Sequence, residues 1–331
     1  DVYKRQQVVR MGNAPKSDCC TLGLTKSVRM PKKILVLGRD GQLGFELRRS
    51  LAPLGDVAAV GRSECDLTYP LQLARVVRRE KPDVIVNAAA LTSVERAEED
   101  VVRAMRINAE AAGELAALAA SRGALIVHYS SDYVFDGKKQ DPYVEADVPA
   151  PLNAYGRSKL AGERAVQAMN PAHLVFRTSW IYGVFGNSFL KSMLMALRQP
   201  ESLRVVSDQR GAPTGAAFIA DVTALAVARY LGGKAEFPFG LYHLAAAGQA
   251  TWHDYACYVA EQARIAGLPV TLVPADIHPV PSSQYPSTAR RPLNSCLDTR
   301  LLTQRFGIHA PPWQEGVRHA LAAMAGSRNL A

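Results

Sequence analysis

The sequence of 331 residues lacks any long apolar run. Its hydrophobic segments are short, and Ile34–Gly38 and Val84–Ala90 are representative. Crossing a bilayer takes roughly 20 consecutive apolar residues, so the sequence excludes a transmembrane protein. Glycine and proline, at 24 and 20 residues, are too few for collagen or for low-complexity linkers. With 48% hydrophobic and 21% charged residues, the composition is typical of a globular chain.

Cysteine is also scarce, and its spacing is uninformative for metal binding. The sequence has no CxxC pair and no paired histidines near its five cysteines, which are Cys19, Cys20, Cys65, Cys257 and Cys296. This excludes a zinc site and a disulfide framework, and no metal is predicted. A reducing, cytoplasmic location is expected.

The net charge of +9 does not indicate nucleic-acid binding. About +4 of it comes from residues 1–29, which have six basic and two acidic side chains. Basic residues are not interleaved with aromatics, so neither a nucleic-acid nor a membrane partner is expected. The remaining charge suits an anionic ligand such as a nucleotide. Residues 1–29 lack the apolar core of a signal peptide, and we interpret them as a disordered or non-native extension before a native start at Met30.

Strand-like and helix-like segments alternate along the first half of the chain. Short apolar runs predict buried strands at 34–37, 56–60, 84–86, 125–129 and 174–176. Helical patterns lie between them, beginning after a turn at 38–44 and continuing at 71–80, 101–122 and 155–168. This alternation predicts an α/β fold with a Rossmann-type, doubly wound parallel sheet.

The alternation weakens beyond residue 180, and prolines gather at 274–286. We predict a dinucleotide-binding domain over residues 30–180, with a segment around 205–245 returning to it. Residues 181–204 and 246–331 are predicted to form a smaller, C-terminal substrate-binding lobe.

A glycine cluster follows the first predicted strand and precedes a helix. Its spacing, Gly38, Gly41 and Gly44 with Gln42 and Leu43 between them, matches the phosphate-binding turn of dinucleotide folds. Gly38 allows the tight turn, Gly41 lets the backbone approach a pyrophosphate, and Gly44 lets the helix pack close to the sheet. The helix N-terminus adds donors and positive potential.

The second predicted strand ends in Val60-Gly61-Arg62, without the acidic residue that binds the ribose of NAD. Arg62 therefore favours the 2′-phosphate of NADP, and the alternative is a surface arginine. Asp66 and Leu67 follow and are candidates for the adenine pocket. We expect NADPH as cofactor, with NADH as the alternative.

Tyr155 and Lys159 form a YxxxK pattern whose spacing places both side chains on one face of a helix. A nearby ammonium lowers the pKa of a phenol, so Tyr155 is a candidate acid or base. The third member should lie where the preceding strand ends, at Ser130 or Ser131. His128, within that strand, is interpreted as a core residue.

These motifs resemble the extended short-chain dehydrogenase/reductases, and within them the dTDP-4-dehydrorhamnose reductase branch. The resemblance covers about residues 30 to 325. It rests on ILVLGRDGQLG, DVIVNAAALTSVERAE, SSDYVFDG, YGRSKLAGE, RTSWIYG, SDQRGAPT and YPSTARRPLNSCLDT. Two departures stand out: Ser131 replaces the usual threonine, and Leu91 replaces a tyrosine or histidine.

The resemblance implies roles for individual residues. Ser131, rather than Ser130, takes the catalytic hydroxyl role because it precedes Asp-Tyr-Val-Phe. The implied cofactor contacts include Ala89, Ala90, Tyr129, Tyr155 and Lys159, and the implied substrate contacts are Thr92, Val94, Ser131, Asp132 and Trp180. Glu46 matches one position of a magnesium site whose other positions have no match here. Gln209, Arg177 and Arg291 meet phosphate or sugar in one interpretation and tie loops together in the other.

The resemblance implies reduction of the 4-keto group of dTDP-4-dehydro-L-rhamnose by NADPH, giving dTDP-L-rhamnose for polysaccharide synthesis. The partner is then the nucleotide sugar, and the chain a monomer or homodimer. One alternative is a nucleotide-sugar epimerase, which would show no net use of NADPH. Another is a non-catalytic, NADP-binding regulatory subunit of S-adenosylmethionine synthetase. A dehydratase is disfavoured because Asp-Tyr, and not Asp-Glu, follows Ser131.

Overall fold

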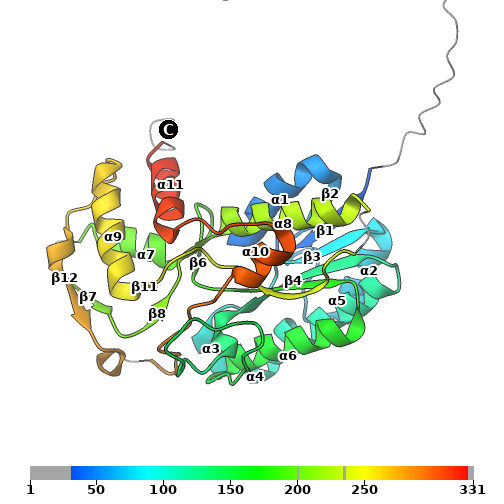
Figure 1. The fold of residues 1–331 in the computed structure, drawn as a ribbon, viewed down its shortest axis with the longest axis horizontal. Helices are drawn as coiled ribbons and strands as arrows, with labels where there is room; N and C mark the ends of the chain where they lie inside the picture. Colours follow the sequence, from blue (N-terminus) through cyan, green and yellow to red (C-terminus); the bar gives the residue numbers. More distant parts are fainter. Residues whose placement is uncertain (1–30, 200, 234–235, 286, 327–331) are drawn as a thin grey trace, which may run out of the picture. The chain divides into compact units, whose positions relative to one another are not determined.

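The computed structural model describes residues 31–199, 201–233, 236–285 and 287–326 (Figure 1). The predicted extension, residues 1–29, lies outside this range. The central sheet has six parallel strands in the order β10-β5-β4-β3-β1-β2. Their bounds are Lys33–Leu37 (β1), Asp56–Val60 (β2), Val84–Asn87 (β3), Leu125–Ser131 (β4), His173–Thr178 (β5) and Gly240–His243 (β10). The predicted doubly wound sheet is thus confirmed, with its order reversing between β1 and β3.

Alternate residues of the strands enter two separate cores, because successive side chains point to opposite faces. Ile34 and Val36 pack against α1 (Gln42–Leu51) and α8 (Ala216–Leu231), which lie above the sheet in Figure 1. Leu35 and Leu37 pack on the other face. That face is covered by α2 (Pro70–Glu80), α5 (Ala111–Ala120) and α6 (Ala154–Met169).

The helix predicted over residues 101–122 is interrupted. The structure shows α4 (Val101–Met105), a π-helical turn over Arg106–Glu110, and then α5, with a further helix, α3 (Val94–Glu99), before them. Asn108 in the π turn is buried and holds both backbone groups of Leu91, at 2.9 and 3.0 Å. The wider turn thus aims a polar side chain inward, which periodicity does not reveal.

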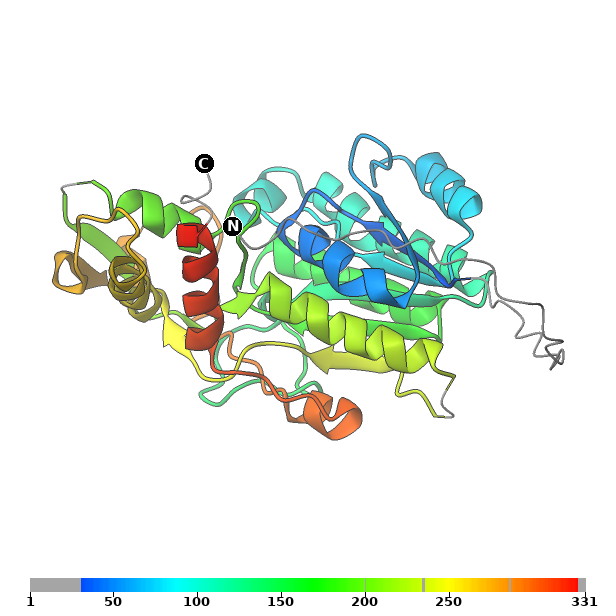
Figure 2. The ribbon, with the colours of Figure 1, turned by 90° about the horizontal axis from the view of Figure 1, so that it is seen from above.

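A second hydrophobic core lies beyond the sheet. It is built by α7 (Phe189–Ala196), α9 (Trp252–Ile265) and α11 (Trp313–Gly326), seen together in green, gold and red in Figure 2. Strand β7 (Leu203–Val206) pairs in parallel with β12 (Ile277–Val280) beside them. Short two-residue strands complete this region: β6 (Ile181–Tyr182) with β9 (Thr214–Gly215), and β8 (Arg210–Gly211) with β11 (Ala250–Thr251).

Two segments pack differently from the predicted division. Residues 205 and 206, expected in the returning segment, belong to β7 and pair with β12. Leu302 of α10 (Arg300–Phe306), expected in the second lobe, is buried in the core above the sheet. Chain order misleads here because α8 and β10 carry the chain back to the sheet, and α10 then packs beside them.

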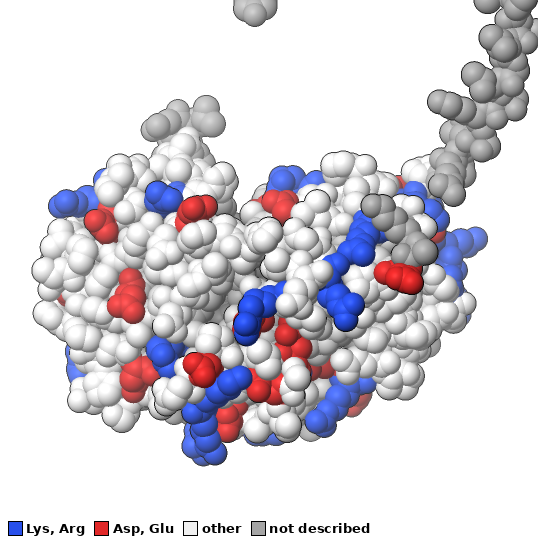
Figure 3. Space-filling model, in the orientation of Figure 1, with Lys and Arg blue, Asp and Glu red and all other residues white. Residues whose placement is uncertain are grey.

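Charges of both signs alternate over the face shown in Figure 3. In the described part of the chain, no helix is both long and apolar enough to cross a membrane.

Candidate functional site

The carboxyl ends of the parallel strands open into a cavity of about 860 Å³. Five strands of the sheet contribute: Gly38 follows β1, Gly61 follows β2, and Asn87, Ser131 and Thr178 end β3, β4 and β5. Ligands of doubly wound sheets bind at this edge, near the point where the strand order reverses. Every predicted cofactor, catalytic and substrate residue lines the cavity except Gly44.

The glycine turn has the backbone that the motif predicts. Gly38 has φ +87°, and a Cβ there would lie 2.8 Å from the Ala89 nitrogen. A Cβ on Gly44 would lie 2.0 Å from the Gly38 oxygen, so only glycine lets α1 approach the turn this closely. Gly41, Gln42 and Leu43 face the cavity, and the buried Gln42 Oε1 has no partner among the described residues. The turn thus brings the N-terminus of α1, with its N–H groups and positive potential, to the place where a phosphate would bind.

Arg62, Asp66 and Leu67 form one rim of the cavity. The exposed Arg62 Nε lies 3.2 Å from Asp66 Oδ2, and Asp66 also accepts from the Thr68 nitrogen at 2.9 Å. The Thr68 and Arg62 hydrogen bonds lower the pKa of Asp66 despite partial burial. The arginine is therefore held at the cavity by a carboxylate and remains open to a second anion.

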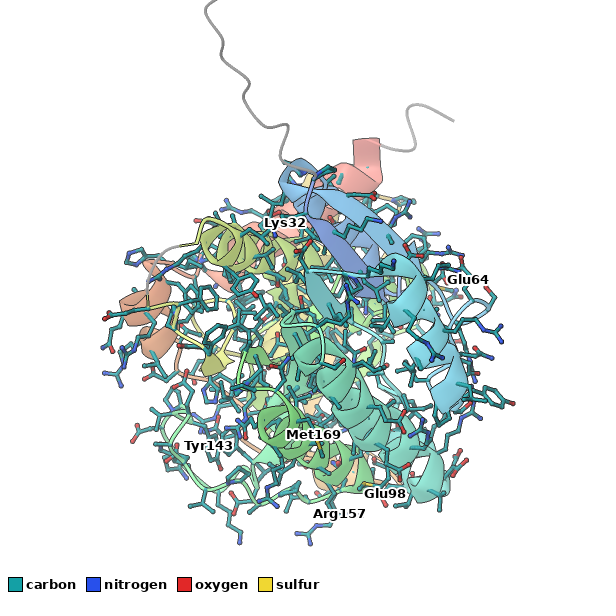
Figure 4. The ribbon with its side chains drawn as sticks, turned by 90° about the vertical axis from the view of Figure 1, so that its right-hand side faces the viewer. Lys32, Glu64, Glu98, Tyr143, Arg157 and Met169 are labelled. Carbon is teal, nitrogen blue, oxygen red and sulfur yellow. The ribbon has the colours of Figure 1, made fainter. Side chains whose placement is uncertain are left out.

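Tyr155 and Lys159 lie on the first turns of α6 and both line the cavity. The helix begins here because buried Asn153 caps it, accepting from the Gly156 nitrogen at 2.8 Å. Glu98 of α3 accepts from the Ala154 nitrogen at 2.7 Å. Glu98 and Arg157, 3.9 Å apart, lie near each other at the start of α6 (Figure 4). Asn153 and Glu98 thus fix the first turn of α6, and with it the position of Tyr155.

The ionisation of Tyr155 differs from the prediction. Lys159 was expected to lower its pKa, but burial raises the pKa of Tyr155 to about 12, with a smaller opposing effect from the Ser131 hydrogen bond. Burial also lowers the pKa of Lys159 to about 8, opposed by Glu163. Desolvation outweighs the charge of one neighbour in this site. Tyr155 is therefore protonated at neutral pH and suited to donate a proton.

Of the two candidate serines, Ser131 is the one near enough to Tyr155 to lower its pKa. Its Oγ donates to Asp132 Oδ1 at 2.8 Å and accepts from the Tyr133 nitrogen at 3.1 Å. Ser130 also lines the cavity, but its Oγ has no partner among the described residues.

His128 is a core residue, as interpreted from the sequence. It is 1% exposed, its Nδ1 lies 3.3 Å from Asn87 Nδ2, and burial together with the Lys159 charge lowers its pKa well below the usual range.

The predicted substrate residues Thr92, Val94 and Trp180 line the same cavity as Tyr155. Trp180 has φ +46°, and its ring covers Gly211, where a Cβ would lie 2.4 Å from the indole. Its indole stacks on Trp252. Trp252 also lines a second cavity of about 810 Å³, so the two cavities share this side chain.

The sequence left it open whether Arg177, Gln209 and Arg291 contact a ligand or hold loops together, and their surroundings in the structure differ. Arg177 is buried and forms two hydrogen bonds with Glu163, at 2.7 and 2.8 Å, which assigns it to the core. Gln209 accepts from Trp252 Nε1 at 3.2 Å and lines the second cavity. Arg291 pairs with Glu95 and also lines the second cavity.

Two positions of interest lie away from the cavities. Leu91 packs with Ala97 and Ala104, beside Tyr155, and does not line the main cavity. Glu46 pairs with Arg49 at 3.2 Å. The described residues contain no group of three or more histidine, cysteine or acidic side chains suited to a metal ion.

Sequence reasoning missed Asn108, Asn153 and Trp252. Asn153 had a signal, since an asparagine just before a helical pattern is a cap candidate. Asn108 and Trp252 had none, because their importance comes from contacts with residues distant in the chain.

A parallel sheet with such a serine, tyrosine and lysine at its carboxyl edge is shared by the extended short-chain dehydrogenase/reductases, and this is the class that fold and cavity define. Within that class, the chain belongs to the dTDP-4-dehydrorhamnose reductase family. A family profile described as the RmlD substrate binding domain matches residues 32–325.

Curated relatives and solved structures agree with this placement. The dTDP-4-dehydrorhamnose reductase of Burkholderia thailandensis is 48% identical over 86% of this chain and 96% of its own length. That of Salmonella typhimurium is 46% identical over 88% and 97%. The Bacillus anthracis enzyme, solved in complex with NADP, is 30% identical with a TM-score of 0.80, covering 89% of this chain and 100% of its own. The predicted family is confirmed.

Proposed function

We propose that the chain reduces the 4-keto group of dTDP-4-dehydro-L-rhamnose to the alcohol of dTDP-L-rhamnose, with NADPH as the reductant. The observation that carries this proposal is the placement of Ser131 beside a protonated Tyr155 in a cavity that also contains the glycine turn. Relatives named for this reaction are 37–48% identical to the chain.

The cavity suits NADPH on its own geometry. The turn at Gly38 and Gly41 allows the backbone to approach a pyrophosphate. Arg62 lines the cavity and is proposed to bind a 2′-phosphate, and its neighbours Asp66 and Leu67 are proposed to contact the adenosine. The rest of this cavity, toward Tyr155, is lined by Ala89, Ala90, Tyr129 and Lys159. When bound, NADPH supplies the hydride.

The chain's own residues supply the proton and the orientation. Tyr155 donates its phenolic proton to the ketone oxygen as that oxygen gains negative charge. Ser131 holds the same oxygen by a hydrogen bond, and such a donor aimed at a developing oxyanion stabilises the transition state. Lys159 lies one turn away on α6 and, when charged, favours the tyrosinate left behind.

The second cavity suits the nucleotide half of the substrate. It contains Arg204, Arg290 and Arg291, which complement a diphosphate, and the edge of Trp252. Thr92, Val94 and Trp180 are proposed to face the sugar between the two cavities.

The test is NADPH oxidation at 340 nm with dTDP-4-dehydro-L-rhamnose, comparing the wild type with Tyr155→Phe. We expect one NADPH consumed per sugar and turnover at least about 100-fold lower in the variant, the usual size of a general-acid effect. Sugar isomerisation without net NADPH loss would favour an epimerase. Bound NADPH with no turnover would favour the regulatory subunit, and either result overturns the proposal.

A cytoplasmic location and a monomeric or dimeric state complete the proposal. Cys65, Cys257 and Cys296 are free thiols, as a reducing compartment requires.

A further inference from the structure

The carboxyl group of Asp132 is buried against hydroxyl groups. The residue is 3% exposed and lies directly after β4, next to Ser131. Ser131 Oγ donates to Asp132 Oδ1 at 2.8 Å, and Ser179 Oγ donates to Oδ2 at 3.0 Å. Ser295 lies near enough to lower the pKa of Asp132, but its Oγ donates to the Arg210 carbonyl at 3.1 Å. None of the ion pairs in the described residues includes Asp132, so the carboxyl group has hydrogen-bond partners but no counter-ion.

This arrangement matters because a serine hydroxyl has one proton. When Asp132 is ionised, Ser131 gives that proton to the carboxylate, and a lone pair of its oxygen accepts from the Tyr133 nitrogen. No donor then remains on Ser131 for a ketone oxygen. When Asp132 is neutral, its own O–H donates to Ser131, and the serine proton is free to point at the ketone.

The charge of Asp132 opposes the reaction in the same way. Ketone reduction builds negative charge on an oxygen held by Ser131 and Tyr155, and a buried carboxylate next to them would repel it. A neutral carboxyl removes this repulsion.

Burial favours the neutral form. It raises the pKa of Asp132 to about 6, against the lowering effect of its serine hydrogen bonds. Among the described residues, Tyr133, Tyr155 and Cys296 are affected by the charge of Asp132, and none of them adds positive charge. Lys159 lines the same cavity but forms no ion pair with Asp132. The phosphates of a cofactor and a nucleotide sugar would add further negative charge nearby and raise the pKa of Asp132 again.

We propose that Asp132 is a positioning residue that acts through Ser131: in its neutral form it turns the Ser131 hydroxyl toward the reacting oxygen, and in its ionised form it withdraws that hydroxyl. The inference rests on the proposed reductase function. It replaces the predicted role of Asp132 as a direct sugar contact with one exerted through a neighbour.

The first test is the pH profile of kcat for the wild type, Asp132→Asn and a control, Asp136→Asn. The control removes a carboxylate four residues away that bonds Tyr143 and lines neither cavity. We expect wild-type and control kcat to fall about tenfold per pH unit above the ionisation of Asp132. Asp132→Asn should stay within about fivefold of the wild-type low-pH plateau and lose this fall, because an amide is neutral and can donate to Ser131.

Two results would overturn the inference. One is a fall in kcat with rising pH that persists in Asp132→Asn, since the ionisation responsible would then belong to another group. The other is a folded Asp132→Asn protein whose kcat is more than about 100-fold lower across the whole range, since a neutral donor would then not suffice. If Asp132→Asn does not fold, Ser131→Thr should keep the whole fall, and Ser131→Ala should keep only the smaller part due to repulsion by the carboxylate. A fall of undiminished size in Ser131→Ala would contradict action through Ser131.

A second measurement needs neither substrate nor cofactor. Infrared titration of the free protein between about pH 4 and pH 8 should show a protonated carboxyl band that titrates above ordinary aspartates and is missing in Asp132→Asn. Absence of such a band overturns the neutral carboxyl. A wild type that shows the band but does not reduce the keto sugar would instead count against the proposed function.

Discussion

The indole rings of Trp180 and Trp252 stack face to face, with centroids 3.5 Å apart and planes 6° from parallel. Trp180 follows β5, whereas Trp252 begins α9 in the second core. The stack therefore joins the carboxyl edge of the sheet to the second lobe, where the two cavities share Trp252.

This stack should control substrate binding more than chemistry. We expect Trp252→Ala to raise KM for the nucleotide sugar about tenfold, because an aromatic pair contributes about 0.5–1.5 kcal/mol beyond the area it buries. Turnover should stay within about twofold, since Tyr155 is untouched, and Trp252→Phe should be intermediate. Phe239→Ala, at a half-exposed ring that lines neither cavity, is the control. A loss of kcat with unchanged KM would contradict this role.

Arg62 should determine the preference for NADPH over NADH. Arg62→Ser removes a cation at the cavity rim, so KM for NADPH should rise about tenfold, the size expected for one charged hydrogen bond. KM for NADH, which has no 2′-phosphate, should barely change. Arg78→Ser, at an exposed arginine bonded to the Ala74 carbonyl, should affect neither. Equal losses with both cofactors would identify Arg62 as structural.

Lys159 should lower the free energy of unfolding even though turnover depends on it. Its pKa in the fold, about 8, is below its ordinary value of 10.5, so the unfolded chain binds more protons between these values. Stability should therefore rise with pH from about 8 to 10.5, and the full destabilisation is present below pH 8. Lys159→Met should raise the free energy of unfolding at pH 7 by about 1–3 kcal/mol and remove this slope, while abolishing turnover.

Denaturant unfolding at several pH values measures both effects. Lys138→Met is the control, because its side chain is 83% exposed. An unchanged slope in Lys159→Met would show that the buried ammonium is not its origin.

The pair of Arg177 and Glu163 should contribute to stability and not to ligand binding. Glu163→Gln leaves a buried guanidinium unpaired, so we expect a loss of about 3–5 kcal/mol in the free energy of unfolding. The double variant Glu163→Leu/Arg177→Met should lose less than the sum of its single changes. Arg300→Met breaks an exposed pair and should cost at most about 1 kcal/mol. A raised KM without lost stability would restore Arg177 as a ligand contact.

Much of the fold was predictable because the four inner strands of the sheet are buried on both faces. Such strands read as short apolar runs, as Ile34–Leu37 and Val84–Val86 do, and they recur between helical patterns. The edge strand β10 was harder to define, since it follows a helix and a loop that interrupt the alternation. The π turn around Asn108 escaped prediction because a polar residue in a helical pattern looks exposed.

The sequence by itself determined the parts of the site that depend on local spacing. The glycine turn and the Tyr155–Lys159 pair are such parts, because a turn or a helix converts spacing directly into geometry. The tertiary structure alone decided how those groups ionise and which partners they have. Packing raised the pKa of Tyr155, brought Ser179 onto Asp132 and brought Trp252 onto Trp180, because desolvation and contacts between distant segments exist only once the chain has packed.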